Sequence, residues 1–112
     1  MTETESIKIG NLRQRVSIEE PVRTGDGGGG AQEIWVELAQ VWAQIRPLNG
    51  SERAEADGIA GKVSHEIVMR FRADIAPEHR LVYDGRIFDI RAVLDLDERR
   101  RFLRCLVEER DL

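Results

Sequence analysis

An Asp-Gly pair between two strand-like runs constrains this chain more than any other feature. Asp84 and Gly85 separate residues 80–83 from residues 86–90, and both runs are rich in strand-forming side chains. A type I′ turn needs positive φ at both central residues, and Asp-Gly is one of the pairs that meet this need. The pattern predicts a tight β-hairpin. The expected cross-strand pairs are Tyr83 with Arg86, Leu81 with Phe88, and Arg80 with Asp89.

Alternating apolar and polar residues predict four further strands, because a half-buried strand has a period of two. These strands span residues 12–20, 34–47, 63–71 and 101–109, and the second hairpin strand continues to residue 94. The stretch Val63–Asp95 is therefore expected to hold three consecutive antiparallel strands. We expect Pro21 to close the first strand, since proline has no N–H to donate to a ladder. A change of apolar parity within residues 34–47 predicts a bulge near Ala39 and Gln40.

The segment Thr24–Gly30 is mostly glycine, and ordering it costs a large backbone entropy. We expect a mobile loop tip, either a hairpin that becomes ordered against a partner or a plain flexible loop. A phosphate-binding loop is disfavoured, because no Lys-Ser or Lys-Thr pair and no helix follow the glycines.

The segment Asn49–Gly61 is the one convincing helix. Asn49 and Glu52 have the spacing of a capping box, and good helix formers follow them. The helix has few apolar residues, so deep burial is not expected. It is either a surface crossover or a segment that packs against a neighbouring subunit.

These elements predict a mainly β fold: a small six-stranded antiparallel β-barrel or sandwich with one short inserted helix and one long mobile loop. With 112 residues, we expect a flexible leader over residues 1–10 and a single domain over residues 11–112. A charged fraction of 34% and a net charge of -4 indicate a soluble protein. The sequence shows no secretory signal and no long apolar run, so we expect synthesis in a cytosol and no membrane contact.

Candidate catalytic and metal-binding residues are few. His65 occupies an apolar position of a strand, where a neutral structural histidine is the common case, and His79 follows Pro77 in a turn where solvation is expected. Cys105 is expected to be a small buried side chain rather than a reactive thiol. Neither histidine has the partners of a nucleophilic or zinc site, so we expect no catalytic residue, no metal and no cofactor.

Two further features concern partners. Trp35 and Trp42 are expected to pack in the core or at its rim, because an indole buries a large apolar surface. The net acidity and the scarcity of aromatic residues disfavour a domain that grips nucleic acid. The residues thus indicate a small β domain that acts by assembly.

From about Gly10 to Glu109, the chain resembles the phage head-tail joining proteins, which are head completion, stopper or adaptor subunits of tailed phages and gene transfer agents. The resemblance lies in the joint order of several motifs, none decisive alone. They are Leu12-Arg13-Gln14-Arg15-Val16, Glu33-Ile34-Trp35, Val41-Trp42-Ala43-Gln44-Ile45-Arg46-Pro47-Leu48-Asn49-Gly50, Ser51-Glu52, His65-Glu66-Ile67-Val68-Met69-Arg70-Phe71-Arg72, Tyr83-Asp84-Gly85-Arg86-Ile87-Phe88-Asp89-Ile90 and Glu98-Arg99-Arg100.

The resemblance implies a structural protein without enzymatic activity, made in the bacterial cytoplasm and located at the head-tail interface of the virion. Its copies would form a six-fold or twelve-fold ring that retains DNA and docks the tail. The implied partners are the protein itself, portal-adaptor proteins, and tail terminator or tail tube proteins. DNA would pass through the channel without sequence-specific binding.

A loop that reaches the channel or a neighbour is also implied, either Val22–Gln32 or Leu48–Lys62. The expected contact residues are Thr24, Gly25, Asp26, Gly27, Gly28, Asn49, Ser51, Glu52, Arg53, Glu55 and Asp57, with Asp84 and Gly85 as the structural hairpin. Two alternatives stay open. One is a β-barrel module that binds nucleic acid or a peptide at a sheet edge. The other is a small hydrolase that uses His65 or Asp84.

Overall fold

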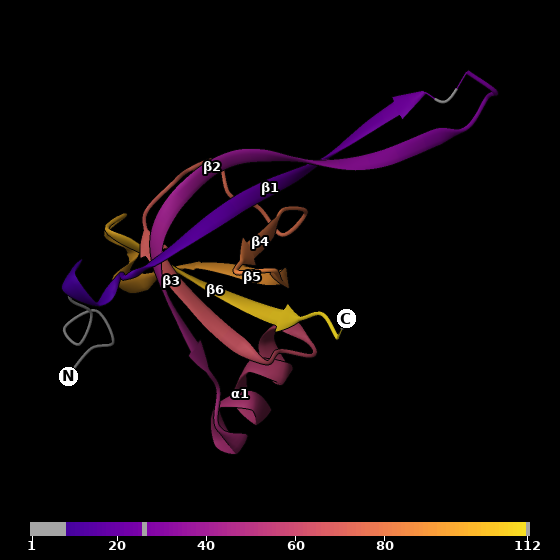
Figure 1. The fold of residues 1–112 in the computed structure, drawn as a ribbon. Coiled ribbons are helices and arrows are strands. Elements are labelled where there is room, and N and C mark those ends of the chain that lie inside the picture. The colour runs from indigo at the N-terminus through magenta and orange to yellow at the C-terminus, as the bar shows by residue number, and fades with distance from the viewer. Residues whose placement is uncertain (1–8, 26, 112) are drawn as a thin grey trace.

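In the computed structural model, which describes residues 9–25 and 27–111, six antiparallel strands close into a barrel (Figure 1). Around the barrel they follow the order β1-β2-β3-β6-β5-β4. The strands are β1 (Gln14–Gly25), β2 (Ala31–Pro47), β3 (His65–Arg70), β4 (Arg80–Tyr83), β5 (Arg86–Asp95) and β6 (Phe102–Glu109). The helical elements are α1 (Gly50–Ala60) and the 3₁₀ turns η2 (Ile9–Asn11) and η3 (Leu96–Glu98). The predicted class is confirmed, with a barrel rather than a sandwich.

The hairpin of β4 and β5 forms with the predicted register. Leu81 pairs with Phe88, and the two strands join through Asp84 and Gly85. These two turn residues have φ angles of 50° and 77°, which is the conformation that a type I′ turn requires. Leu81 and Phe88 are both fully buried. The local turn and the core therefore specify the same pairing.

Strand β2 is bent by a bulge close to the predicted position. Ile18 of β1 pairs with Ala39, whereas Glu19 pairs with Glu37, so Leu38 is the extra residue. Before the bulge β2 pairs with β1 alone, and from Ala43 onward it also pairs with β3. The bend thus carries one strand from the barrel wall into a projection.

The prediction that Pro21 ends the first strand is wrong. β1 continues to Gly25, and Pro21 pairs with Trp35 of β2. On its other side β1 pairs with β4 only over residues 17–19, so a missing N–H is tolerated beyond that point. The predicted loop is correspondingly shorter, because strand pairing reaches Gly25 and Ala31. Of the predicted leader over residues 1–10, residues 1–8 lie outside the described part of the chain.

The three antiparallel strands expected within Val63–Asp95 are present as β3, β4 and β5, and β3 lies between β2 and β6 rather than beside β4. Its alternation is confirmed, since Ile67 and Met69 are fully buried. Val68, on the opposite face, is also buried because Leu12 and Leu96 cover it. Apolar residues from all six strands fill the barrel. The buried core cluster is Val16, Ile18, Ala43, Ile67, Met69, Ile75, Leu81, Phe88, Ile90, Leu103, Cys105 and Val107.

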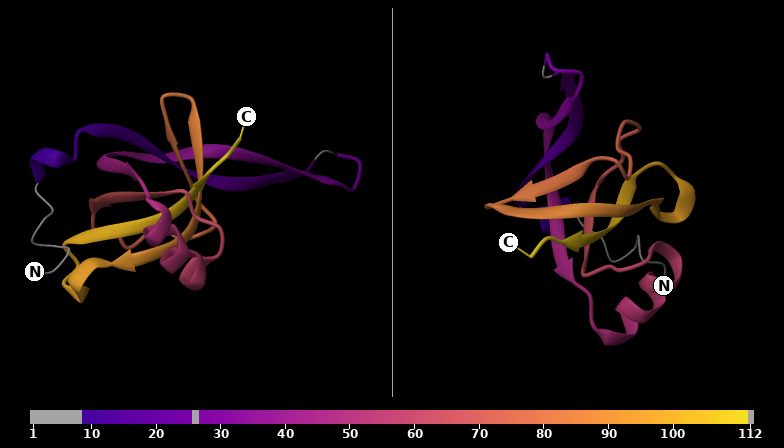
Figure 2. Two further views of the ribbon diagram at one scale, coloured as in Figure 1. Left: turned by 90° about the horizontal axis from the view of Figure 1, so that it is seen from below. Right: turned by 90° about the vertical axis from the view of Figure 1, so that its right-hand side faces the viewer.

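Helix α1 lies outside the barrel, and the right-hand view of Figure 2 shows it below the strands. The predicted capping box is present, because Asn49 Oδ1 accepts the Glu52 amide at 2.9 Å and Glu52 accepts the Asn49 amide at 3.0 Å. Ala56 is the buried residue of α1 and packs with Leu48 and Leu106. The helix therefore rests on the wall through a small contact, as its sparse apolar content predicted.

Two of the predicted environments are wrong. His79 is buried rather than solvated, with 7% of its surface exposed, and its Nδ1 accepts the Ala76 amide at 3.0 Å. The imidazole of His79 thus closes the turn that precedes β4. Trp42 is 53% exposed rather than packed in the core. Cys105 is buried as expected, and burial raises the pKa of its thiol to about 12.

Replacing Gly85 tests the turn. At φ 77°, a side chain in Gly85→Ala is strained, so we expect a loss of about 1–2 kcal/mol in the free energy of unfolding. The matched control is Gly58→Ala in α1, which has open space for a Cβ and should be neutral or stabilising by up to about 1 kcal/mol. Urea unfolding followed by circular dichroism measures both. Equal changes in the free energy of unfolding for Gly85→Ala and Gly58→Ala would contradict a type I′ turn at Asp84 and Gly85.

Removing the helix cap tests whether Asn49 has a structural role. Asn49→Ala leaves the Glu52 amide without its acceptor, so we expect a loss of about 1 kcal/mol in unfolding free energy. Ser51→Ala, at an exposed neighbouring position, should change stability by less than about 0.5 kcal/mol. The same urea titration compares them, and a neutral Asn49→Ala would show that the cap contributes nothing.

Candidate functional site

A two-stranded arm projects from the barrel (Figure 1). We define the arm as residues 20–25 of β1 and 31–37 of β2, joined by the glycine-rich tip. These segments pair with each other and with no other described strand. The arm makes the molecule elongated, with extents of 56 × 27 × 26 Å. Both outer edges of the arm therefore present unpaired backbone groups.

One face of the arm is apolar and exposed. Ile34, Val36 and Leu38 are 42%, 41% and 36% exposed, respectively. Ile34 and Val36 share a face because side chains alternate along a strand. On the opposite face, Trp35 is half-buried beneath Arg80, whose guanidinium lies 4.3 Å from the ring centroid. The prediction of rim packing is confirmed for Trp35. The exposed residues Ile34 and Val36 are its neighbours along β2.

The arm also carries carboxylates. Glu20 lies opposite Val36 in the strand register, whereas Glu33 lies opposite Arg23 and contributes to the raised pKa of Arg110. Glu37 lies at the base of the arm. Hydrogen bonds from Gln40 and Ser17 lower the pKa of Glu37, and Arg15 acts in the same direction. Arg23 is the one basic residue in the described part of the arm. The arm is thus net acidic at neutral pH.

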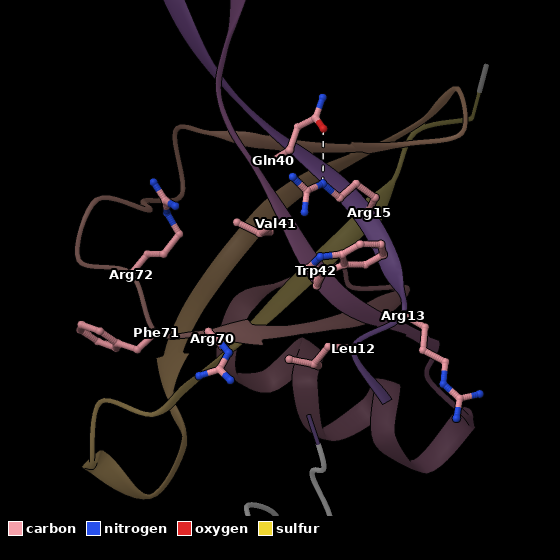
Figure 3. A pocket seen from close by; sticks show the side chains of 9 residues that line it. All are labelled: Leu12, Arg13, Arg15, Gln40, Val41, Trp42, Arg70, Phe71 and Arg72. Atoms are coloured by element: carbon pink, nitrogen blue, oxygen red, sulfur yellow. Dashed lines mark hydrogen bonds between the residues drawn. The ribbon is translucent and has the colours of Figure 1, made fainter. Parts of the chain in front are cut away.

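A basic groove of about 750 Å³ lies on the barrel near the base of the arm (Figure 3). Arg15 covers the exposed Trp42, with 5.1 Å between its guanidinium and the ring centroid. Arg72 is paired with Asp74 at 2.8 Å. Arg13 and Arg70, like Arg15, have no described carboxylate within ion-pair distance. The groove is lined by Leu12, Arg13, Arg15, Gln40, Val41, Trp42, Arg70, Phe71 and Arg72.

The predicted contact residues of the first loop lie at the end of the arm. Thr24 Oγ1 donates to the Gln32 carbonyl at 3.3 Å, and Gly25 pairs with Ala31. Gly27 has φ 81°, a conformation that favours glycine. Gly28 is exposed beside it. Asp26 lies outside the described residues.

The predicted contact residues of the second loop divide into two groups. Asn49 and Glu52 serve the helix cap, and Glu52 also binds Arg46 through two hydrogen bonds of 2.8 Å. This pairing lowers the pKa of Glu52 to about 2. Asp57 accepts the Val63 amide at 3.1 Å. The other members, Ser51, Arg53 and Glu55, are exposed, as are Asn49 and Asp57.

His65 belongs to a structural network. Its Nδ1 lies 2.8 Å from Ser64 Oγ, and that oxygen accepts the Glu109 amide at 2.8 Å. Burial lowers the pKa of His65, while nearby Glu109 acts in the opposite direction. Arg86 lowers the pKa of Glu109 through hydrogen bonds of 2.8 and 3.0 Å. The Ser64 hydroxyl thus fastens β6 to the start of β3, and Asp84 lies in the hairpin turn.

The arginine groove was not predicted from the sequence. Arg13 and Arg15 have the outward parity of the first strand, and Arg70, the last residue of β3, and Arg72 just after it share an alternation of the same kind. This alternation was the available signal, but the order of strands in the sheet was needed to bring the two pairs together. In the described part of the chain, no cluster of three His, Cys, Asp or Glu residues suits a metal ion. Nor is any described helix long and apolar enough to cross a membrane.

Two solved structures are similar to this chain. The solution structure of protein SF1141 from Shigella flexneri 2a is 27% identical and superposes with a TM-score of 0.77 over 92% of this chain and 96% of that chain. A chain in the virion of a native gene transfer agent particle is 33% identical, with a TM-score of 0.63 over 88% of this chain and 94% of that chain. No curated protein matches the chain.

The family of phage head completion proteins matches residues 7–110, nearly the whole barrel and arm. This match agrees with the resemblance that the motifs predicted. It also agrees with the virion structure among the similar proteins, and the family is one of structural phage head proteins rather than a known enzyme family. The chain therefore belongs to the phage head completion protein family and is a structural protein of the virion.

Proposed function

We propose that copies of this protein form a closed ring at the head-tail interface, where the ring retains packaged DNA and provides the surface on which the tail docks. The arm is the single observation that carries this proposal. A two-stranded ribbon with an exposed apolar face is marginally stable alone in water, so a partner that covers this face is expected. The ring would hold six or twelve copies.

The proposed partners follow from the position of the ring. Portal-adaptor proteins would contact it on the head side, and tail terminator or tail tube proteins on the tail side. DNA would pass through without sequence-specific binding, and a net charge of -4 agrees with a channel that does not hold it. The tip residues Thr24, Gly25, Gly27 and Gly28 and the exposed α1 residues Ser51, Arg53 and Glu55 are proposed as subunit or channel contacts.

A nucleic-acid-binding module is the second candidate, because the groove gathers the guanidinium groups of Arg13, Arg15 and Arg70, which have no described carboxylate within ion-pair distance. Such a module would bind DNA with a steep salt dependence, since phosphate contacts release counterions. Electrophoretic shifts at two salt concentrations separate this candidate from a structural ring subunit.

Deleting the gene from the cell that produces the particles tests the proposal. We expect heads without attached tails and packaged DNA that becomes sensitive to nuclease, because the head would not be closed. Negative-stain microscopy and nuclease protection measure the two effects, and the wild-type gene supplied in trans should reverse both. Tailed particles with protected DNA in normal number would show that the protein has another role.

A further inference from the structure

We propose that one end of the barrel docks an acidic segment of a different virion protein, an inference that rests on the proposed position of the ring between two partners. We call this surface the basic end. It consists of the groove and of the turn that joins β5 to β6 through η3. Its arginines are Arg13, Arg15, Arg70, Arg72, Arg99, Arg100 and Arg101.

The groove and the turn are parts of one surface. The Phe71 amide donates to the Arg101 carbonyl at 3.0 Å, which places the turn beside the end of β3. Leu12, next to Arg13, shares a small buried cluster with Leu96 of η3. The start of β1, the end of β3 and the turn therefore meet at the same end of the barrel.

Positive charge gathers at the basic end. Five of its arginines are exposed and have no described carboxylate within ion-pair distance: Arg13, Arg15, Arg70, Arg99 and Arg100. Two nearby carboxylates are already used, because Asp74 pairs with Arg72 at 2.8 Å and Asp95 accepts the Arg100 amide at 3.1 Å. The whole chain has a net charge of -4, so the charge distribution is strongly uneven. Such a surface attracts an anionic partner.

Contacts within the chain position two of these guanidinium groups in advance. Arg13 Nε donates to the Gly10 carbonyl at 2.7 Å. Arg15 Nε donates to Gln40 Oε1 at 3.4 Å, and the same guanidinium lies 5.1 Å from the Trp42 ring centroid. Each of these hydrogen bonds uses one N–H group, and the others are left for a ligand. A side chain that is already held loses less rotamer freedom when a partner binds.

The turn between β5 and β6 has a costly backbone conformation. Glu98 and Arg100 have φ angles of 58° and 55°, which are uncommon for residues other than glycine. The Asp95 carboxylate holds the Arg100 amide, and Leu96 is buried. Such conformations persist where the surrounding contacts enforce them, and they cluster at functional sites. The turn therefore presents Arg99 and Arg100 in a fixed arrangement.

The apolar part of the groove favours a protein segment over DNA. Trp42 is 53% exposed, and Val41 and Phe71 line the same groove. Arginine and tryptophan are enriched among the residues that dominate protein–protein binding energies. Duplex DNA would offer phosphates to the arginines and leave Trp42 in water. A single strand would need the Trp42 ring for stacking, but Arg15 already covers that ring.

Ion pairs within the chain favour a different protein over a second copy. Seven carboxylates already pair with arginine or lysine residues of the same chain: Glu19, Glu52, Glu66, Asp74, Asp89, Glu108 and Glu109. A second copy could offer these carboxylates to the basic end only by breaking its own pairs. An acidic segment of another protein carries no such cost.

Photo-crosslinking from the groove tests the proposal in assembled particles. Trp42 is replaced by p-benzoylphenylalanine, an aromatic side chain that bonds covalently to a contacting C–H group under near-ultraviolet light. Mass spectrometry then identifies the captured segment. We expect a segment of a different virion protein that contains neighbouring Asp or Glu residues. The matched control carries the same side chain at Glu78, an exposed site outside the basic end, and should not capture that segment.

Neutralising two arginines tests the electrostatic part. Adding Arg13→Gln and Arg70→Gln to the crosslinking variant should lower the yield of the captured segment about tenfold, because two ion pairs are lost. Arg91→Gln and Arg110→Gln cause the same change in net charge at exposed sites outside the basic end and should leave the yield unchanged. Reversing the charge of both partners, with Arg13→Glu and Arg70→Glu here and lysines in the captured segment, should restore the yield. A fold defect does not produce such a restoration.

Four outcomes overturn the proposal. They are capture of DNA, capture of a second copy of this chain, capture of a segment without carboxylates, and no capture in particles that bear tails. An equal loss of yield from the control pair also overturns it. All of these results leave the proposed ring standing, because the gene deletion tests the ring independently.

Discussion

Closure of the barrel depends on a short seam between β1 and β4. The seam consists of three residue pairs, over residues 17–19 of β1. Ile18 and Leu81 form its centre and are both fully buried. At its end, Arg80 Nε donates to Glu19 at 2.7 Å, and the same guanidinium lies over Trp35 of β2. One arginine side chain thus links three strands at the point where the sheet closes on itself, and without closure the edges of β1 and β4 would be exposed.

The shortness of this seam explains the arm. Beyond Glu19, β1 has β2 as its one described partner, and the bulge at Leu38 lets β2 bend away with it. The same two strands therefore belong to the barrel at one end and to a free ribbon at the other. The core fixes the direction of the ribbon, because Val16 and Ile18 are buried just before it begins. A rigid barrel thus positions an element that lacks a core of its own.

Local signals in the sequence were sufficient for the turn and the cap, and insufficient for features that depend on strand order. Asp84 and Gly85 determine their hairpin through their own φ angles, and the capping box of Asn49 spans four residues. Pro21 does not end the first strand, because a missing N–H interrupts a strand only where it has neighbours on both sides, and β1 has one described neighbour at that point. His79 is buried in a turn, where its bond to Ala76 is local, but nothing in the pattern of residues around Pro77 predicted that burial. The groove combines arginines from the start of β1 with others from the end of β3, and no local pattern specifies that proximity.

The composition of the arm determines the kind of partner that it admits. An exposed ribbon edge would ordinarily recruit any extended chain, but Pro21 removes one donor from β1 and the glycine tip adds no apolar side chains. The carboxylate of Glu20 further opposes edge-to-edge pairing between copies. The apolar face, by contrast, is left open by Ile34 and Val36. Recognition through the face requires a surface with matching shape and opposite charge, whereas recognition through an edge requires only backbone. The arm is therefore better suited to one specific protein surface than to strand addition by an arbitrary peptide.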